Sequence, residues 1–324
     1  MNILNIPEDS SLLHKAYELY ISAIQNHDLL HQSLSYKEFQ QKLFPFRKSL
    51  NTIHLIDSES KAFASGCLDQ ETGKAYITLI LVDPQYRQQG LGRTMLHHLE
   101  NRLLAGGKKN TVEISFFNPI TFTWRIPDVQ NALHPNTPGI DILSPAYSFF
   151  EHCGYNEFAT QQSYYLPLGQ YQLPPDIPAK KAALLQNNIS IQVYNHRFHQ
   201  GMDEMITKLG NPVWNRELLT ELPPDQGGRP ILTAVHEARV CGFAGPLDVE
   251  ASGRGYFSGI GIDSAYRGRG LAKVLFNELC ANLKDMGADY MTLFTGIDNP
   301  AGNIYREAGF FIVRTWANMK KTER

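Results

Sequence analysis

The spacing of apolar and polar residues divides the chain into two stretches with the same order of elements. In the first stretch, apolar positions every three or four residues predict helices, and short apolar or alternating runs between polar turns predict strands. The predicted strands are 2–6, 52–56, 62–68, 75–82, 111–117 and 155–166, and the predicted helices follow Ser11, cover 36–43, begin at Leu91 and cover 145–152.

The second stretch repeats this order. Its predicted strands are 189–194, 231–236, 240–244, 256–262, 290–295 and 310–316, and its predicted helices are 199–209, 213–222, 271–286 and 299–308. A proline-containing segment between the stretches is typical of a linker. We therefore expect an N-terminal domain of residues 1–168, a linker of 169–188 and a C-terminal domain of 189–324.

A fixed numerical offset relates the two stretches. The offset of 180 positions joins five pairs of identical residues: Asp83 and Asp263, Tyr86 and Tyr266, Arg87 and Arg267, Gly90 and Gly270, and Leu91 and Leu271. Further on, Gly154 and Gly309 are 155 positions apart. The offset is smaller there because the first stretch contains an additional proline-rich segment, 118–144, which we interpret as an active-site flap or a packing insert. The chain is therefore an internal duplication with one insertion.

Composition narrows the function classes. The chain has 324 residues, of which 43% are hydrophobic, and is long enough for two globular domains. A net charge of -2 gives no support to a nucleic-acid or membrane-surface partner, and no apolar run approaches a membrane span. The four cysteines lack CxxC spacing, so we expect no metal site. The amino-terminal residues lack a signal-peptide pattern, which favours a cytoplasmic protein.

Residues 83–93 and 263–273 each contain a strand end, a glycine-rich turn and a helix start. Such a turn directs several backbone N–H groups and the positive end of a helix at one point, which favours a bound phosphate. The order of elements also predicts a right-handed crossover, with the strand before each turn parallel to the strand after the helix. Two other phosphate motifs are excluded. GxxxxGK[ST] is absent, and Lys273 stands where a dinucleotide fingerprint needs glycine or alanine.

Both turns resemble the motif of the GNAT acyltransferase superfamily, Arg-x-x-Gly-x-Gly/Ala after a strand that ends in Val/Ile-Asp. The resemblance covers nearly the whole chain as a tandem pair of domains. It implies an α/β fold whose mixed sheet is splayed between two parallel strands, with acetyl-CoA in the splay. The residues that it assigns to acyl-CoA are Val82, Arg87, Gln88, Gln89, Gly90, Gly92 and Arg93 in the first copy, and Ile260, Ile262, Arg267, Gly268, Arg269, Gly270, Ala272 and Lys273 in the second.

The resemblance also assigns a proton donor. In GNAT enzymes a tyrosine four residues before a Gly-Phe pair commonly protonates the departing thiolate, and Tyr305 stands at this position. The alternative for Tyr305 is a half-buried structural tyrosine. Asn299 resembles the asparagine that holds the pantetheine arm, although it lies one residue nearer the tyrosine than in many members. In the first copy the corresponding residues are Phe150 and Ser144, so that copy lacks the acid. This division is similar to tandem members such as mycothiol synthase, in which the C-terminal domain is active.

The general base is less well defined. Family members often use a glutamate on the strand before the loop, and residues 254–262 contain none. Nearby candidates are His236, Glu237, Asp263 and Asp298, or a water relay. Glycines 259 and 261 lie on one face of their strand and either leave room for a ligand or mark a bulge or close packing.

The sequence therefore predicts an acetyl-CoA-dependent N-acetyltransferase whose C-terminal domain acts on a primary amine of a small molecule or peptide. A non-catalytic acyl-CoA-binding or sensing protein and a transferase of a longer acyl group are the alternatives. The insert offers Trp124, Arg125, His134 and Asp141, which either lean over an acceptor cleft or pack as a surface flap.

Overall fold

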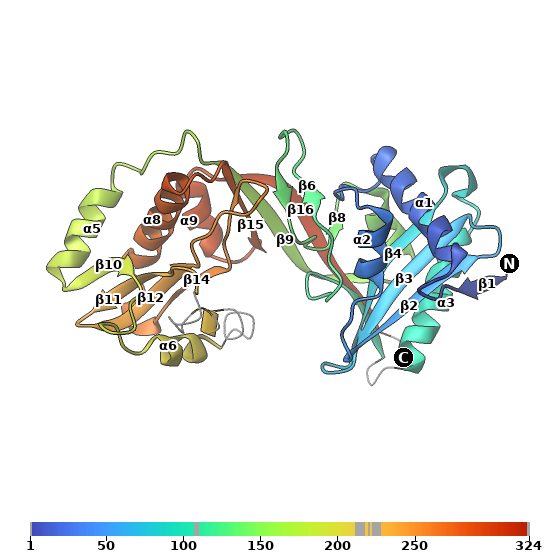
Figure 1. The fold of residues 1–324 in the computed structure, drawn as a ribbon, viewed down its shortest axis with the longest axis horizontal. Helices are drawn as coiled ribbons and strands as arrows, with labels where there is room; N and C mark the ends of the chain where they lie inside the picture. The colour runs from blue at the N-terminus through green and yellow to red at the C-terminus, as the bar shows by residue number, and fades with distance from the viewer. Residues whose placement is uncertain (1, 107–109, 211–217, 220, 222–227, 323–324) are drawn as a thin grey trace. The chain divides into compact units, whose positions relative to one another are not determined.

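The computed structural model describes residues 2–106, 110–210, 218–219, 221 and 228–322 (Figure 1). The chain forms two compact units. The first unit combines Met1–Gln162 with Arg314–Arg324, and the second unit is Ser163–Val313. Among the described residues, none of the helices combines the length and apolarity that crossing a membrane requires.

The first unit contains the meander and the insert. Its elements are β1 (Ile3–Asn5), α1 (Ser11–Gln25), α2 (Tyr36–Leu43), β2 (Leu50–Asp57), β3 (Ala62–Asp69), β4 (Lys74–Val82), η1 (Pro84–Tyr86), α3 (Leu91–Ala105), β5 (Thr111–Ile114), β6 (Trp124–Arg125), β7 (Leu133–His134), β8 (Ile140–Asp141), α4 (Pro145–His152) and the start of β9 (Asn156–Pro167). Strands β1 to β4 pair in order and antiparallel, which confirms the predicted meander.

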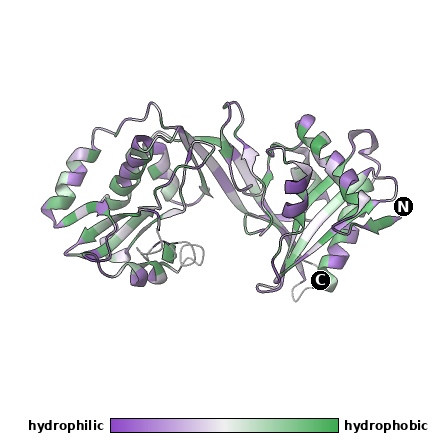
Figure 2. Cartoon of the chain, viewed as in Figure 1, coloured by the Kyte–Doolittle hydropathy of each residue, from purple (hydrophilic) through white to green (hydrophobic). Residues whose placement is uncertain are grey.

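Helices cover both faces of this sheet because its strands are apolar on both sides. Phe63 of β3 packs with Leu13 of α1 and Phe39 of α2, whereas the neighbouring Ala64 packs with Leu99 of α3 (Figure 1). Hydrophobic residues are accordingly concentrated on the central strands (Figure 2). Alternate residues of one strand thus face two separate cores.

The second unit repeats this plan with one added helix. Its elements are α5 (Ile177–Gln186), β10 (Ile189–Val193), α6 (Met202–Leu209), β11 (Leu232–His236), β12 (Arg239–Gly245), β13 (Arg254–Gly255), β14 (Gly259–Ile262), η3 (Ser264–Tyr266), α8 (Leu271–Asp285), β15 (Tyr290–Gly296), α9 (Ala301–Glu307) and the start of β16 (Phe311–Thr322). Strands β10, β11, β12 and β14 form an antiparallel sheet.

Both units contain a parallel strand pair that separates along its length. In the first unit β4 and β5 pair in parallel at Ala75–Val112 and Tyr76–Glu113, and these pairs lie at the beginning of β4. In the second unit β15 pairs in parallel with β13, while β14 pairs with β12. The predicted parallel pairing is therefore present in the first unit, where β5 follows α3, and in the second unit it involves β13 rather than β14; the splayed mixed sheet is present. The predicted single strand 256–262 is wrong, because the strand is interrupted between β13 and β14.

The units differ from the expected domains in two places. The expected linker 169–188 contains α5, whose Lys181 forms an ion pair with Glu278 of α8 at 2.9 Å. The last residues also belong elsewhere: β16 pairs antiparallel with β5 of the first unit, from Met319–Ile114 to Thr322–Thr111. Among the smaller differences, α6 begins at Met202 rather than at residue 199. The predicted helix 213–222 lies mostly outside the described residues.

Candidate functional site

The two glycine-rich loops have the same local geometry. Asp83 and Asp263 each accept a hydrogen bond from the backbone N–H two residues later, at 3.0 Å. The Nε of Arg87 and of Arg267 donates to the carbonyl oxygen that ends the preceding strand, at 3.1 and 3.4 Å. Each loop therefore turns back over the end of its strand before a helix begins.

A glycine in the left-handed region starts each helix. Gly90 has φ 83° before α3, Gly270 has φ 74° before α8, and neither supplies a side-chain cap. Within the described chain, the backbone N–H groups of 88–93 and 268–273 donate no hydrogen bond to the protein. A Cβ built at Gly90 or Gly268 would meet nothing within 4 Å. Unbonded N–H groups at the positive end of a 15-residue helix, beside open space, are an arrangement that favours binding of an anion.

The arginines of the two loops differ in their partners. Arg87 binds both carboxylate oxygens of Asp28, at 3.0 and 2.5 Å, and this pairing raises the pKa of Arg87. Arg269 of the second loop lies over the Tyr266 ring at 5.3 Å. The first loop also places Gln88 at φ 62°, where the second loop has Gly268 at 77°. The first loop is therefore the more constrained of the two.

Helix α5 adds charged side chains to the second loop. Lys273 Nζ lies 2.9 Å from Asp176 and 2.9 Å from Glu307, and Lys180 Nζ lies 2.5 Å from the same Asp176 oxygen. These lysines hold the pKa of Asp176 at about 2. The Lys180 side chain also lies 4.0 Å from the position of a Cβ on Gly270. Sequence reasoning missed Lys180 because it lies in the expected linker.

Tyr305 lies inside an aromatic cluster of the second unit. Its side chain is 5% exposed, with ring centroids 4.8 Å from Phe276, 5.7 Å from Tyr164 and 6.3 Å from Phe310. Burial raises the pKa of the Tyr305 phenol, so the group keeps its proton at neutral pH. The environment suits a proton donor as well as a structural tyrosine.

Asn299 lies at the exposed start of α9. Its Oδ1 accepts a hydrogen bond from the Ala301 N–H at 3.0 Å, so the side-chain amide NH2 is the part that could bind a ligand carbonyl. In the first unit Ser144 precedes α4 in the same way, and its hydroxyl donates to the Asp141 carbonyl at 2.8 Å. Phe150 is buried with 6% exposure and has no proton to donate.

Two of the four candidate general bases, Asp263 and His236, have structural partners. Asp263 binds Lys208 Nζ through both oxygens, at 3.1 and 3.0 Å, which supports its role in the turn. His236 Nδ1 lies 2.9 Å from the Tyr266 hydroxyl. Glu237 occupies the hairpin tip at φ 49°. The geometry assigns no general base.

The space beside Gly261 is filled by protein. A Cβ there would lie 2.5 Å from Leu209 and 2.6 Å from Phe243. Of the two alternatives given above for Gly261, close side-chain packing therefore explains this glycine. The neighbouring Ile260 and Ile262 pair with Ala244 and Gly242 of β12 and pack against the core of the unit.

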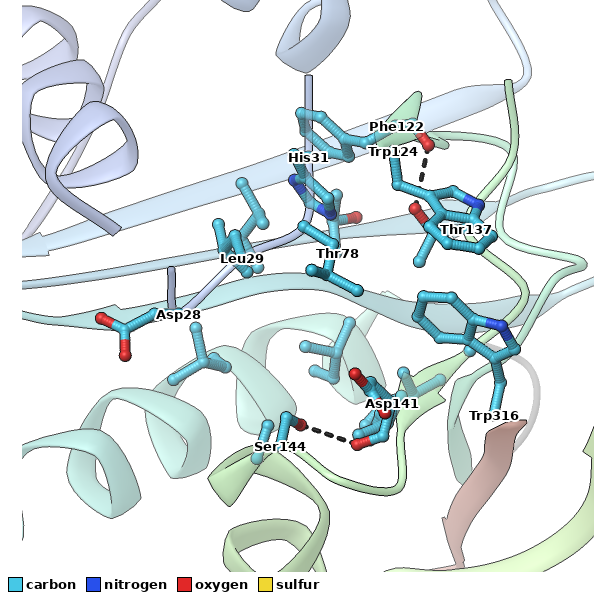
Figure 3. Close-up of a pocket in the computed structure, with 18 of the residues that line it drawn as sticks. Asp28, Leu29, His31, Thr78, Phe122, Trp124, Thr137, Asp141, Ser144 and Trp316 are labelled. Atoms are coloured by element: carbon cyan, nitrogen blue, oxygen red, sulfur yellow. Dashed lines mark hydrogen bonds between the residues drawn. The ribbon is translucent and has the colours of Figure 1, made fainter. Parts of the chain in front are cut away.

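A pocket of about 350 Å³ lies in the first unit, where β4 has separated from β5 (Figure 3). Two of the insert residues singled out above, Trp124 and Asp141, line it. Arg125 is exposed, and His134 is buried beside Trp124 with ring centroids 6.0 Å apart. The insert therefore forms a wall of a pocket in its own unit. Sequence reasoning missed several other polar wall residues, among them Asp28, His31 and Arg314, because no motif marks them.

The described residues include no group of three or more His, Cys, Asp or Glu side chains placed to hold a metal ion. The candidate site thus consists of two anion-binding loops, a buried tyrosine in the second unit and a pocket in the first.

Comparison with known proteins gives consistent matches. The family model described as "Acetyltransferase (GNAT) family" matches residues 15–119 and 198–310. A mycothiol acetyltransferase of Thermobifida fusca (strain YX) is 25% identical over 281 residues, which cover 79% of this chain and 78% of that protein.

Solved structures match over nearly the whole chain. A GCN5-related glucosamine N-acetyltransferase region of a fungal multi-domain GH3 beta-N-acetylglucosaminidase has a TM-score of 0.71 at 14% identity; the match covers 99% of this chain but 38% of that protein. A GCN5-related N-acetyltransferase from Sphaerobacter thermophilus has a TM-score of 0.63 at 17% identity, with 99% and 95% covered. A tandem GNAT protein from the clavulanic acid biosynthesis pathway has a TM-score of 0.60 at 12% identity, with 99% and 98% covered. At these identities the structural matches establish the fold.

Proposed function

Because the chain belongs to the acetyltransferase (GNAT) family, we propose that its second unit transfers an acetyl group from acetyl-CoA to a primary amine. The observation that carries the proposal is the second loop, whose unbonded N–H groups fit the pyrophosphate of coenzyme A. The name of the Thermobifida fusca relative supports acetyl transfer as the reaction.

The reaction needs a neutral amine, which attacks the thioester carbonyl carbon while the carbon–sulfur bond breaks. Tyr305 donates its proton to the departing thiolate, and its raised pKa keeps that proton available at neutral pH. Asn299 holds the pantetheine arm through its side-chain amide. Water removes the proton from the attacking amine, since the geometry assigns no side chain as the general base.

A second function is favoured for the first unit. Its loop has the same geometry, but Phe150 stands where the second unit has Tyr305. We infer that the first unit binds acyl-CoA without catalysing acetyl transfer. This division would make the first unit a binding module and the second unit the enzyme.

Release of free coenzyme A, followed with a thiol reagent against a panel of primary amines, tests the proposal. Replacing Tyr305 by Phe should lower kcat about 100-fold with little change in KM, because general acid catalysis contributes roughly 10² to 10⁴. The matched control is Tyr164→Phe, which changes a tyrosine 5.7 Å away in the same cluster. Amine-dependent release that is equal in the two variants would remove Tyr305 from the mechanism. Acetyl-CoA binding without release on any amine would make the protein a sensor.

A further inference from the structure

The pocket in the first unit is built from parts of the chain that lie far apart in sequence. The α1–α2 connection provides His31, β4 provides Thr78, the insert provides Trp124 and Asp141, and β16 provides Trp316 (Figure 3). Its volume of about 350 Å³ lies within the range of roughly 300–1,000 Å³ of ligand pockets. These side chains line one pocket that is partly open to solvent.

Two buried polar atoms on this pocket have no hydrogen-bond partner within the described chain. They are His31 Nδ1 and Arg314 Nε, and His31 is only 8% exposed. Burial lowers the pKa of His31 to about 3, so the ring is neutral at physiological pH. Buried polar atoms in native proteins are nearly always hydrogen-bonded. A ligand with matching polar groups would bind both atoms.

The charges on the pocket walls cancel in pairs. Asp28 is neutralised by Arg87, which binds both of its oxygens. Asp141 lies 3.4 Å from Arg314 Nε, close enough for ionic attraction, although the contact lacks hydrogen-bond geometry. Burying an unpaired charge costs far more than burying a hydrogen-bonded neutral group. The pocket therefore favours an uncharged ligand over an anion or a cation.

The apolar walls are aromatic. Trp124 and Trp316 meet edge to face at 4.8 Å, and Phe122 stacks on the His31 ring at 4.6 Å with an interplanar angle of 5°. Buried aromatic rings give the walls an apolar lining for the carbon skeleton of a hydroxylated ring, while His31, Arg314 and the hydroxyl of Thr78 hydrogen-bond its polar groups. We propose that this pocket binds an uncharged, hydroxyl-bearing ring of monosaccharide size and does not acetylate it.

This proposal does not depend on the acetyl transfer assigned to the second unit, and its test uses binding alone. The full-length protein is titrated with D-glucose, D-glucosamine and D-glucuronate, which share one ring size and carry no charge, a positive charge and a negative charge. Two of the three tryptophans of the chain line the pocket, so their fluorescence reports occupancy. Glucose should bind at least about tenfold more tightly than either charged sugar, a difference of about 1.4 kcal/mol. Stronger binding of a charged sugar, or no saturable response to any of the three, would overturn the proposal.

Two variants connect the response to the unpaired atoms. His31→Phe keeps a ring stacked on Phe122, and Arg314→Met keeps an apolar stem; each should weaken glucose binding at least about tenfold. The matched control is Lys320→Met, which removes a positive charge from the same strand outside the pocket. If Arg314→Met does not fold, His31→Phe decides. Glucose binding that is unchanged in His31→Phe would contradict the proposal.

Discussion

Phe150 and Tyr305 occupy equivalent positions in the two units. Each lies four residues before a glycine in the left-handed region, Gly154 at φ 89° and Gly309 at φ 96°. Each ring also contacts the aromatic residue after that glycine, with centroids 5.2 and 6.3 Å apart. The duplicated scaffold is therefore retained, and one hydroxyl group distinguishes the two units at this point.

The buried Tyr305 phenol predicts a pH dependence of stability. Its pKa is raised by burial, so the folded protein keeps the proton in the range above pH 10 where the unfolded chain loses it. The stabilisation is complete below pH 10 and is lost as the pH rises above 10. In urea unfolding between about pH 9.5 and 11, Tyr305→Phe should lose less stability than the wild type. Parallel curves for the two proteins would contradict this.

The loop glycines predict which unit holds acyl-CoA. Gly90→Ala and Gly270→Ala should each destabilise the protein by about 1 kcal/mol, because alanine is unfavourable in the left-handed region. If the loops bind pyrophosphate, each methyl group should also weaken binding at its own loop. Isothermal titration with acetyl-CoA measures the number of sites lost in each variant. Unchanged binding in both variants would exclude the loops as donor sites.

Lys180 should strengthen binding of the donor at the second loop. Its side chain lies beside Gly270, and its charge adds to the positive potential there. Lys180→Gln should raise the KM for acetyl-CoA about fivefold, or about 1 kcal/mol, at low salt, and this effect should shrink in 0.5 M salt, a concentration of about three times physiological. Lys181→Gln on the same helix is the control, since Lys181 pairs with Glu278 of α8, whereas Lys180 pairs with Asp176 and lies beside Gly270. Equal KM values for the two variants would argue against a role for Lys180.

Two buried histidines predict acid sensitivity of the first unit. Burial lowers the pKa of His31 to about 3 and that of His54 to about 4. In the unfolded chain both histidines bind protons near pH 6.5. The free energy of unfolding is therefore highest above that pH and decreases as the pH falls toward 4. The loss should approach about 1.4 kcal/mol per pH unit for each histidine. In urea unfolding, His31→Phe should show a shallower dependence than the wild type. If the unfolding free energy of His31→Phe depended on pH as steeply as that of the wild type, the lowered pKa of His31 would be contradicted.

The ion pair between Lys321 and Glu100 should stabilise the first unit. Glu100 is 1% exposed and accepts bonds from Lys321 Nζ at 2.9 and 3.1 Å and from the Tyr155 hydroxyl at 2.8 Å. Lys321→Met leaves a buried carboxylate without its cation and should cost about 3 kcal/mol of unfolding free energy. The control is Lys320→Met, on the same strand. A cost below that of the control would show that the pair contributes nothing.

The sequence predicted features that repeat or that depend on local spacing. The meander and the two loops follow from periodicity and from the offset between the copies, because each is encoded within a few neighbouring residues, whereas the assignment of Tyr305 came from the resemblance to the GNAT family. The resemblance to the GNAT family, drawn from the loops, is confirmed by the family match.

The features that were missed depend on contacts between distant segments. The prolines of residues 169–188 predict a linker, although Pro178 lies in the first turn of α5, where proline is tolerated. His31 and Arg314 are 283 positions apart and carry no shared motif, so only the folded chain shows that they line one pocket. The end of β16 belongs to the first unit because it pairs with β5, which lies about 200 positions earlier in the chain, and this long-range pairing has no local signal.

That last strand has a consequence for synthesis. Residues 163–313 emerge from the ribosome before the part of β16 that pairs with β5, although residues 1–162 emerge earlier still. Domains generally fold in the order in which they are made. Here the edge of β5 has no strand to pair with until 319–322 have been translated, and an open edge can pair with other chains. All segments of the second unit are therefore translated before the first unit is complete. Until residues 319–322 have been translated, the nascent first unit exposes the unpaired edge of β5.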